Sequence, residues 1–305
     1  MKEGQISGHA TAPETHSAAD GFWEGFYAVD SEFFRLWTDR RLTLSCGLWT
    51  DPVTHRPAAD LDAAQEYKLH RIADLARVRP GTRVLDIGSG FGGMLDHLVQ
   101  ARGVAAAHGV NLIAEQCEET RARGVPGVSV DCVDYRGFTP TEPFDAAVSI
   151  QFVEHIAGEA GDERQRSRRY REFFGMVHDW TVPGAFFGLE AMFSARPSPR
   201  ISADHERREQ ALLTDLHYEG KAPLISEILA GAEGFWEVLS VQSHRDDYVR
   251  TEDEWLRRLN ANEATVRERW GDALFETASR VIRRERRALA DGAFSVAVVS
   301  LRRVD

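Results

Sequence analysis

Residues 84–94 (VLDIGSGFGGM) form a glycine-rich turn between an apolar run and a segment with helical periodicity. Gly88, Gly90 and Gly93 have the spacing of a dinucleotide-binding loop, in which backbone N–H groups and a helix N-terminus hold a pyrophosphate. Asp86 lies just before the first of these glycines, and its carboxylate would repel a pyrophosphate. One like-charge pair about 4 Å apart costs roughly 4 kcal/mol at an effective dielectric constant near 20. The turn therefore favours a ligand with an ammonium group over one with paired phosphates.

S-Adenosylmethionine (SAM) is a ligand of this kind, because it carries an ammonium group and a sulfonium group and no phosphate. A dinucleotide site would also need an acidic residue at the end of the second strand to bind a ribose, and this sequence has Asn111 there. We therefore predict SAM as the cofactor. The alternatives are a dinucleotide and a turn that serves packing alone.

Asp134 and Tyr135 follow the predicted third strand. The carboxylate can accept a hydrogen bond from an adenine amino group, and the tyrosine ring offers a face for stacking. We predict an adenine-binding role for this pair. The alternative is a capped turn followed by a surface aromatic residue.

From about residue 80 onward, predicted strands and helices alternate. The predicted strands are residues 82–88, 104–111, 128–134, 144–151 and 184–192, and the predicted helices are residues 92–103, 113–124 and a stretch around 170–180. This order is typical of an α/β protein with a doubly wound parallel sheet, which binds ligands at the carboxyl ends of its strands. A strand at 235–244, an arginine-rich helix near 253–289 and a strand at 293–304 would complete the fold.

The chain divides into three predicted parts. Residues 1–20 are expected to be a flexible N-terminus, residues 21–79 a helical segment that covers the SAM site, and residues 80–305 the SAM-binding core. Within the core, residues 196–235 interrupt the alternation with prolines and many charged residues. We expect this insertion to form a helical lid over the ligand edge of the sheet.

Composition excludes several classes of function. The 305 residues carry a net charge of −11, which argues against nucleic acid as a partner and weakly against tight binding to anionic membranes. No run of about 18 apolar residues could span a membrane, and the polar N-terminus is unlike a secretory signal. The three cysteines lack metal-binding spacing and suit a reducing compartment. We expect a cytoplasmic protein with a small hydrophobic substrate, at most peripheral membrane contact and no metal ion.

Several segments together resemble one family from about residue 26 to the C-terminus. They are FYAVDSEFFRLWTDRRLTLSCGLW (26–49), the glycine-rich turn, IAEQ (113–116), VDYRGF (133–138) and FDAAVSIQFVEHIA (144–157). A later stretch, residues 220–259, is similar to the family's lid and closing region. On these motifs the sequence resembles the cyclopropane-fatty-acid synthase and mycolic acid methyltransferase family of SAM-dependent enzymes.

The resemblance implies a class I methyltransferase fold and methyl transfer to a carbon–carbon double bond. The SAM contacts of the family would fall on Ser45, Asp86, Gly88, Gly90, Asn111, Leu112, Gln116, Asp134, Tyr135 and Gln151. Its catalytic pocket, which holds a carbonate, would fall on Cys46, Glu154, Glu190 and Tyr248.

Two positions depart from the family pattern. Leu44 replaces a tyrosine, so one expected hydrogen bond to the cofactor is missing. Glu190 replaces a histidine that helps to hold bicarbonate, and a carboxylate there would repel that anion, particularly with Glu154 nearby.

Alkene methylation produces a carbocation that must be shielded from water and then lose a proton. We hypothesise that Glu190 takes this proton in place of bicarbonate while Glu154 stabilises positive charge, since two carboxylates in one apolar pocket raise the pKa of one of them. The alternative is a structural Glu190 paired with an arginine such as Arg196. Aromatic faces, including Tyr27 and Phe193, would line the substrate cavity and stabilise the cation.

Five arginines lie within residues 164–171, and clustered arginines bind phosphates through bidentate hydrogen bonds. With Arg168 and Arg169 as substrate ligands, we predict C-methylation of an alkene-bearing specialised metabolite such as an isoprenyl diphosphate. A solvated helix with alternating charges is the alternative for this stretch. The alternative functions are methylation or cyclopropanation of an unsaturated fatty acyl chain, N-methylation of an amine, and SAM binding without methyl transfer.

Overall fold

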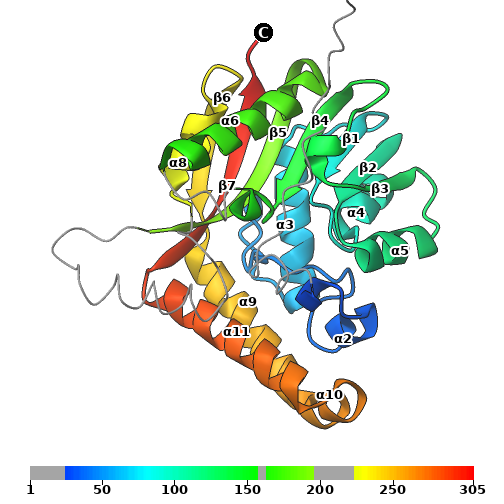
Figure 1. Ribbon diagram of the computed structural model, residues 1–305, viewed down its shortest axis with the longest axis vertical. Coiled ribbons are helices and arrows are strands. Elements are labelled where there is room, and N and C mark those ends of the chain that lie inside the picture. The colour runs from blue at the N-terminus through cyan, green and yellow to red at the C-terminus, as the bar shows by residue number, and fades with distance from the viewer. Residues whose placement is uncertain (1–24, 157–162, 196–222) are drawn as a thin grey trace, which may run out of the picture.

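The computed structural model describes residues 25–156, 163–195 and 223–305, which form a single central sheet covered by helices (Figure 1). The strand order is β3-β2-β1-β4-β5-β7-β6. The strands are β1 (Arg83–Ile87), β2 (Ala106–Asn111), β3 (Val128–Cys132), β4 (Phe144–Ile150), β5 (Thr181–Ser194), β6 (Trp236–Ser243) and β7 (Phe294–Arg303). The first five strands pair in parallel, as predicted, whereas β7 runs antiparallel to both β5 and β6.

Helices pack on both faces of the sheet. They are α2 (Ser31–Arg35), α3 (Leu61–Leu75), α4 (Gly93–Arg102), α5 (Ala114–Ala122), α6 (Glu163–Asp179), α8 (Ile225–Ala232), α9 (Arg245–Ala261), α10 (Glu263–Trp270) and α11 (Asp272–Ala290). Single 3₁₀ turns follow β3 and β4, at η1 (Tyr135–Gly137) and η2 (Val153–His155). This doubly wound arrangement buries the central strands on both faces, which is why they are almost continuously apolar in sequence.

The apolar core has three parts. One lies between the sheet and the pair α6 and α8, and a second lies between the sheet and the pair α3 and α4. The third joins aromatic residues that precede α3 to the inner faces of α9 and α11, with Phe33, Phe34 and Trp37 at its centre. The segment before the sheet and the helices near the C-terminus are therefore folded against each other.

Two predictions about the C-terminal half differ from the structure. The arginine-rich segment near 253–289 is not one helix but a part of three, α9, α10 and α11, which extend away from the sheet in Figure 1. Gly271, with φ at +88°, ends α10 and lets the chain reverse. In the insertion predicted at 196–235, residues 225–232 form α8, which packs on α6 through an ion pair of 2.8 Å between Arg166 and Glu227. Residues 1–24 and 196–222 lie outside the described residues.

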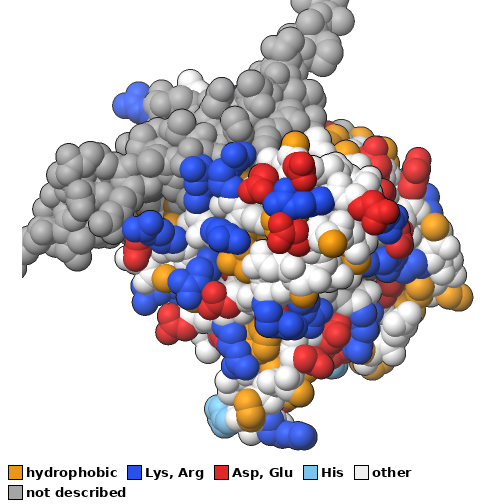
Figure 2. All heavy atoms as spheres, turned by 90° about the horizontal axis from the view of Figure 1, so that it is seen from below, with side chains coloured by type: hydrophobic (Ala, Val, Ile, Leu, Met, Phe, Trp, Pro, Cys, Tyr) orange, Lys and Arg blue, Asp and Glu red, His pale blue; other side chains and the backbone are white. Residues whose placement is uncertain are grey.

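The surface carries mixed charges. On the described part of the face shown in Figure 2, basic and acidic side chains are interspersed. Arg267, for example, contacts Glu263, Asp272 and Glu276 at 2.8, 2.8 and 2.6 Å. Among the described residues, the longest helices are too polar to cross a lipid bilayer.

Close packing of α3 on β5 gives a prediction for Gly188. A Cβ at this glycine would lie 2.6 Å from the carbonyl oxygen of Ile72 in α3, so Gly188→Ala must push the helix from the sheet. We expect a loss of about 1–3 kcal/mol in the free energy of unfolding, measured by urea denaturation. Gly137→Ala is the control, because its Cβ would meet only an ordinary 3.4 Å contact with Val133. Equal stability of the two variants would contradict this packing argument.

Candidate active site

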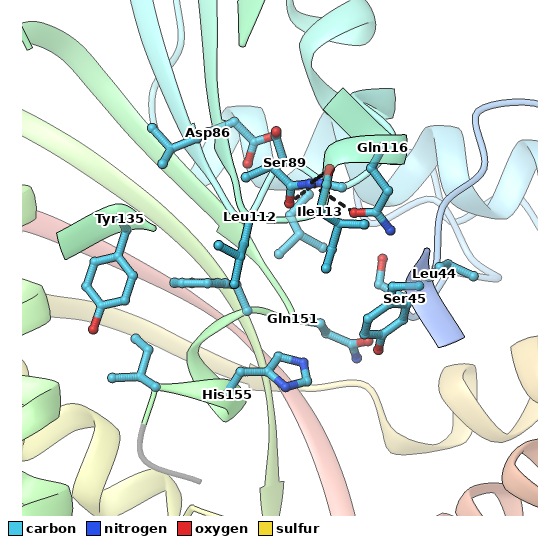
Figure 3. Close-up of a pocket in the computed structure, with 18 of the residues that line it drawn as sticks. Leu44, Ser45, Asp86, Ser89, Leu112, Ile113, Gln116, Tyr135, Gln151 and His155 are labelled. Atoms are coloured by element: carbon cyan, nitrogen blue, oxygen red, sulfur yellow. Dashed lines mark hydrogen bonds between the residues drawn. The ribbon is translucent and has the colours of Figure 1, made fainter. Parts of the chain in front are cut away.

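The glycine turn after β1 brings backbone close to the carboxyl end of β4. Gly88 has φ at +76°, and a Cβ there would lie 2.6 Å from the ring of Phe152. Glycine is therefore required both for the backbone conformation and for the close approach. The N–H of Gly90 donates to Oδ1 of Asn111 at 3.2 Å, and Nδ2 of Asn111 donates to Gln116 at 3.0 Å, as Figure 3 shows. These bonds fix the turn against the end of β2.

A cavity of about 760 Å³ lies at the carboxyl ends of the parallel strands (Figure 3). It is lined by all ten residues predicted to bind the cofactor, namely Ser45, Asp86, Gly88, Gly90, Asn111, Leu112, Gln116, Asp134, Tyr135 and Gln151. The sequence prediction thus picked out residues that the fold brings to one cavity. Their individual contacts with the cofactor stay predictions.

Asp86 is the buried acid of this cavity. It is 2% exposed, and its Oδ1 has no hydrogen-bond partner among the described residues. Burial raises the pKa of Asp86 to about 7, and the nearby Lys68 ammonium opposes that rise. Ser89 Oγ and Gln151 Nε2 are also buried without partners. An acceptor for an ammonium group, together with two further unpaired polar atoms, fits SAM.

Asp134 and Tyr135 line the cavity in a capped turn. The Asp134 carboxylate accepts from the backbone N–H of Arg136 at 2.8 Å and pairs with its guanidinium at 2.6 Å. The Tyr135 ring packs edge-on against Phe152 and Phe173. The capped turn that the alternative interpretation predicted is therefore present. The adenine-binding role of Asp134 and Tyr135 stays a prediction.

Gln151 connects the cavity to a second group of residues behind it. It has φ at +46°, a conformation that costs energy for a residue other than glycine. Its backbone N–H donates to the carbonyl of Glu190 at 2.8 Å, and its Oε1 accepts from Tyr248 Oη at 3.0 Å. Gln151 is thus fixed from both sides.

The four residues predicted as catalytic are buried together behind Gln151: Cys46, Glu154, Glu190 and Tyr248. One carboxylate oxygen of Glu154 accepts from the backbone N–H of Met192, next to Glu190 on β5. Burial, with a smaller contribution from the neighbouring Glu190 carboxylate, raises the pKa of Glu154 to about 8, and the hydrogen bond from Met192 opposes this rise. Burial also raises the pKa of Glu190 to about 7, against the opposing charges of Lys68 and His244. Because both pKa values lie near neutrality, each of these carboxyl groups can take up or release a proton at physiological pH.

Cys46 does not offer a reactive thiolate. Its side chain is fully buried, and burial raises the pKa of the thiol well above its ordinary value. Its backbone lies beside the Glu190 carboxylate, so its contribution to the pocket comes from the main chain.

Three ionisable residues near this group were missed from the sequence, two of them buried and one half-buried. Lys68 on α3 is fully buried, and its Nζ donates to Ser45 Oγ at 2.6 Å. Glu285 on α11 lies 3.4 Å from Tyr248 Oη, and burial raises the pKa of Glu285 to about 7. Glu252 on α9 is also fully buried. Lys68 and Glu252 fall on the apolar faces of their helices, and that position was a signal available in the sequence.

The residues predicted to bind substrate are only partly brought together. Tyr27, Arg168 and Arg169 line the cavity, whereas Phe193 is half-buried on β5 and is not part of the lining. Substrate binding by Tyr27, Phe193, Arg168 and Arg169 stays a prediction.

The arginines of residues 164–171 lie in different surroundings and have different partners. Arg166 is buried in its ion pair with Glu227, and Arg171 donates to the carbonyl of Glu233 at 2.8 Å. Arg168 pairs with Glu172 at 2.8 Å. The five arginines therefore have different surroundings, because a helix turns its successive residues to different sides, and substrate binding by Arg168 and Arg169 stays a prediction.

A sheet of order 3-2-1-4-5-7-6 with antiparallel β7, a glycine turn after β1 and a buried acid in that turn define the class I SAM-dependent methyltransferases. The family model described as mycolic acid cyclopropane synthetase matches residues 19–297. The chain belongs to this family. The predictions of family and fold class are thereby confirmed, and membership of this family of SAM-dependent methyltransferases supports the predicted cofactor.

Known proteins agree with this assignment. Cyclopropane-fatty-acyl-phospholipid synthase of Escherichia coli K12 is 25% identical over 237 residues, which are 77% of this chain and 55% of that protein. The chain thus spans about half the length of this relative. Cyclopropane mycolic acid synthase 2 of Mycobacterium bovis is 28% identical over 257 residues, covering 77% of this chain and 79% of that protein. The crystal structure of mycolic acid cyclopropane synthase CmaA1 complexed with SAH and CTAB superposes with a TM-score of 0.80 at 22% identity, over 95% of this chain and 100% of that one.

Asp86 gives a prediction for cofactor affinity. An ammonium group is bound by the ionised carboxylate, so Asp86→Asn should weaken the binding of S-adenosylhomocysteine by roughly tenfold to a hundredfold, the worth of a hydrogen bond to a charged group. Because the pKa of Asp86 is about 7 in the free protein, affinity should also fall as pH is lowered from 8 to 6. Calorimetry measures both effects. Asp131→Asn, which removes a carboxylate at the exposed end of β3, is the control. Affinity that is unchanged in Asp86→Asn would contradict the assignment.

Proposed function

We propose that this protein transfers the methyl group of SAM to a carbon–carbon double bond of an unsaturated fatty acyl chain, giving a methylated or cyclopropanated product. The observation that carries the proposal is the pair of buried carboxyl groups, Glu154 and Glu190, behind the cofactor cavity, with pKa values of about 8 and about 7. Membership of the family and the printed activities of its curated relatives support an acyl substrate over the isoprenyl diphosphate that we favoured from the sequence.

Bound SAM supplies an electrophilic methyl group. In our proposal Asp86 holds its ammonium end, while Lys68 fixes Ser45 at the other side of the cavity. Tyr27 and Phe152 give the cavity an apolar wall that excludes water from the reacting carbons. The alkene donates its π electrons to form the new carbon–carbon bond, and the sulfur departs with the electron pair of the bond that breaks.

The positive charge left on the acyl chain is stabilised by the ionised Glu190, because Glu154, with a pKa of about 8, is mostly protonated at neutral pH. Glu190 then accepts a proton. If the proton leaves the transferred methyl group, the electrons of the broken C–H bond close a cyclopropane ring; if it leaves a chain carbon next to the charge, they form a new double bond. Glu190 can do this directly because its pKa of about 7 leaves a large ionised fraction at neutral pH.

A bicarbonate base is disfavoured in this pocket. The family resemblance puts a histidine at position 190, where it helps to hold that anion. Here Glu190 lies near Asp247, and the negative charges of these two carboxylates repel an anion. The pocket itself therefore has to provide the proton acceptor.

An isoprenyl diphosphate is less well supported than an acyl chain. Its diphosphate would need several unpaired cations at the cavity mouth, but Arg166 and Arg171 bind within the protein and Arg168 pairs with Glu172. N-methylation is a second candidate, because the excess of buried carboxyl groups would also bind an ammonium-bearing substrate. Glu252 and Glu285 add to that excess.

Labelled cofactor separates these functions. The protein is incubated with SAM deuterated in its methyl group and, in parallel, with phospholipid vesicles of unsaturated acyl chains, with geranyl diphosphate and with simple amines. Mass spectrometry of the acyl product should show two retained deuterons for a cyclopropane and three for a methylated chain. Label in the amine or the diphosphate, with none in the lipid, would overturn the proposal.

The role of Glu190 gives a separate prediction. Glu190→Gln should lower kcat by about 10²- to 10⁴-fold, the usual contribution of a positioned base, with little change in the affinity for S-adenosylhomocysteine. In the unchanged protein the rate should fall as pH drops below 7, because protonation removes the base. Glu118→Gln, a surface change on α5, is the control.

The dependence of turnover on bicarbonate also tests the assignment of Glu190 as the base. Turnover of the unchanged protein should not respond to removal of dissolved carbonate. Glu190→His should respond to it, because that variant restores the residue of the family pattern. A requirement of the unchanged protein for added bicarbonate would exclude Glu190 as the base.

A further inference from the structure

Three potential metal ligands lie together outside the active site, where α3 packs against α4. Glu66 and His70 are one helical turn apart on α3, and His97 is on α4. One ligand atom from each residue lies within 4.8 Å of the other two. A carboxylate and two imidazoles form a ligand set that suits Zn²⁺.

The separations match those around one tetrahedral ion. With Zn–N and Zn–O bonds of about 2.0–2.1 Å, two ligand atoms of a tetrahedron lie about 3.3–3.4 Å apart. Here Glu66 Oε1 is 3.2 Å from His97 Nδ1 and 3.5 Å from His70 Nε2. His97 Nδ1 nevertheless has no hydrogen bond of acceptable geometry. The carboxylate oxygen and the ring nitrogen are therefore close together but not oriented for a hydrogen bond between them. Two atoms that bind the same metal ion have this arrangement.

The state of His97 suits a metal ligand. Its side chain is fully buried, and neither ring nitrogen has a hydrogen-bond partner among the described residues. A buried polar group without a partner is costly, and a metal ion would satisfy it.

The surrounding charges leave one side of the carboxylate free for an ion. Arg40 and Arg41 both contact Glu66 at Oε2, each at 3.5 Å, whereas the two histidines face Oε1. The arginines therefore orient the carboxylate through the oxygen that faces away from the histidines, as outer partners of metal ligands do. Their positive charges also weaken the attraction for a cation, so the imidazoles must supply much of the affinity.

We propose that Glu66, His70 and His97 bind one Zn²⁺ ion, with a fourth position open to water. His70 is 43% exposed in its side chain, which gives the ion a path from solvent. The ion would join α3 to α4, and α3 also carries Lys68, which holds Ser45 at the cofactor cavity. The proposed role is structural, and it is independent of the reaction assigned above.

Calorimetry on chelator-treated full-length protein, titrated with zinc chloride, tests the proposal. We expect saturable binding of one ion per chain, a thermal unfolding midpoint that rises with zinc concentration, and loss of both effects in His70→Ala. This variant changes a half-exposed residue, so it should keep the fold, which circular dichroism checks. His178→Ala, which alters a histidine on α6 outside the triad, is the control and should bind zinc like the unchanged protein.

Glu66→Gln and a cobalt titration make the test independent of one variant. Glu66→Gln keeps the size of the side chain and should weaken zinc binding at least tenfold. Bound Co²⁺ should show the strong visible absorption of a tetrahedral site. No saturable zinc binding, equal binding by His70→Ala, or the weak spectrum of an octahedral cobalt ion would each overturn the proposal.

Discussion

The Lys68 ammonium is the buried charge on which the cofactor cavity and the acidic pocket both depend. It donates to Ser45, and it lowers the pKa values of Asp86 and Glu190 against the effect of burial. Without a cation at this place, burial alone would favour the protonated form of both acids. Neutral Asp86 would lose its attraction for an ammonium group, and neutral Glu190 could accept no proton. A single helix residue thus couples the ligand-binding and proton-accepting halves of the site.

Gln151 provides the second connection between these halves. Its strained backbone lets one residue bond to Glu190 through its N–H and to Tyr248 through its side chain, while it still lines the cavity. Through these two bonds Gln151 fixes one wall of the cavity against β5 and α9.

The parts of the site that could be predicted are those whose neighbours are close in sequence. The glycine turn, Asp86 and the ends of the parallel strands follow from local patterns, and the family resemblance added Glu154, Glu190 and Tyr248. Glu285 was missed because only the packing of α11 on α9 brings it to Tyr248. The different surroundings of the α6 arginines could not be predicted from their spacing alone: the helix buries Arg166 against Glu227, whereas Arg168 lines the cavity. The break at Gly271 likewise reflects a chain reversal that helical composition hides.

Helix α3 is held on three sides at once. Its C-terminal end lies against Gly188 of β5, its apolar stripe carries Lys68, and its outer side carries Glu66 and His70. Each residue advances about 100° around a helix axis, so deleting one residue between 61 and 72 would rotate part of the helix by nearly a third of a turn. No single rotation could restore all three contacts. We therefore regard the length of α3 as the least adjustable dimension of this protein, whereas individual side chains on its solvent side have more freedom to vary.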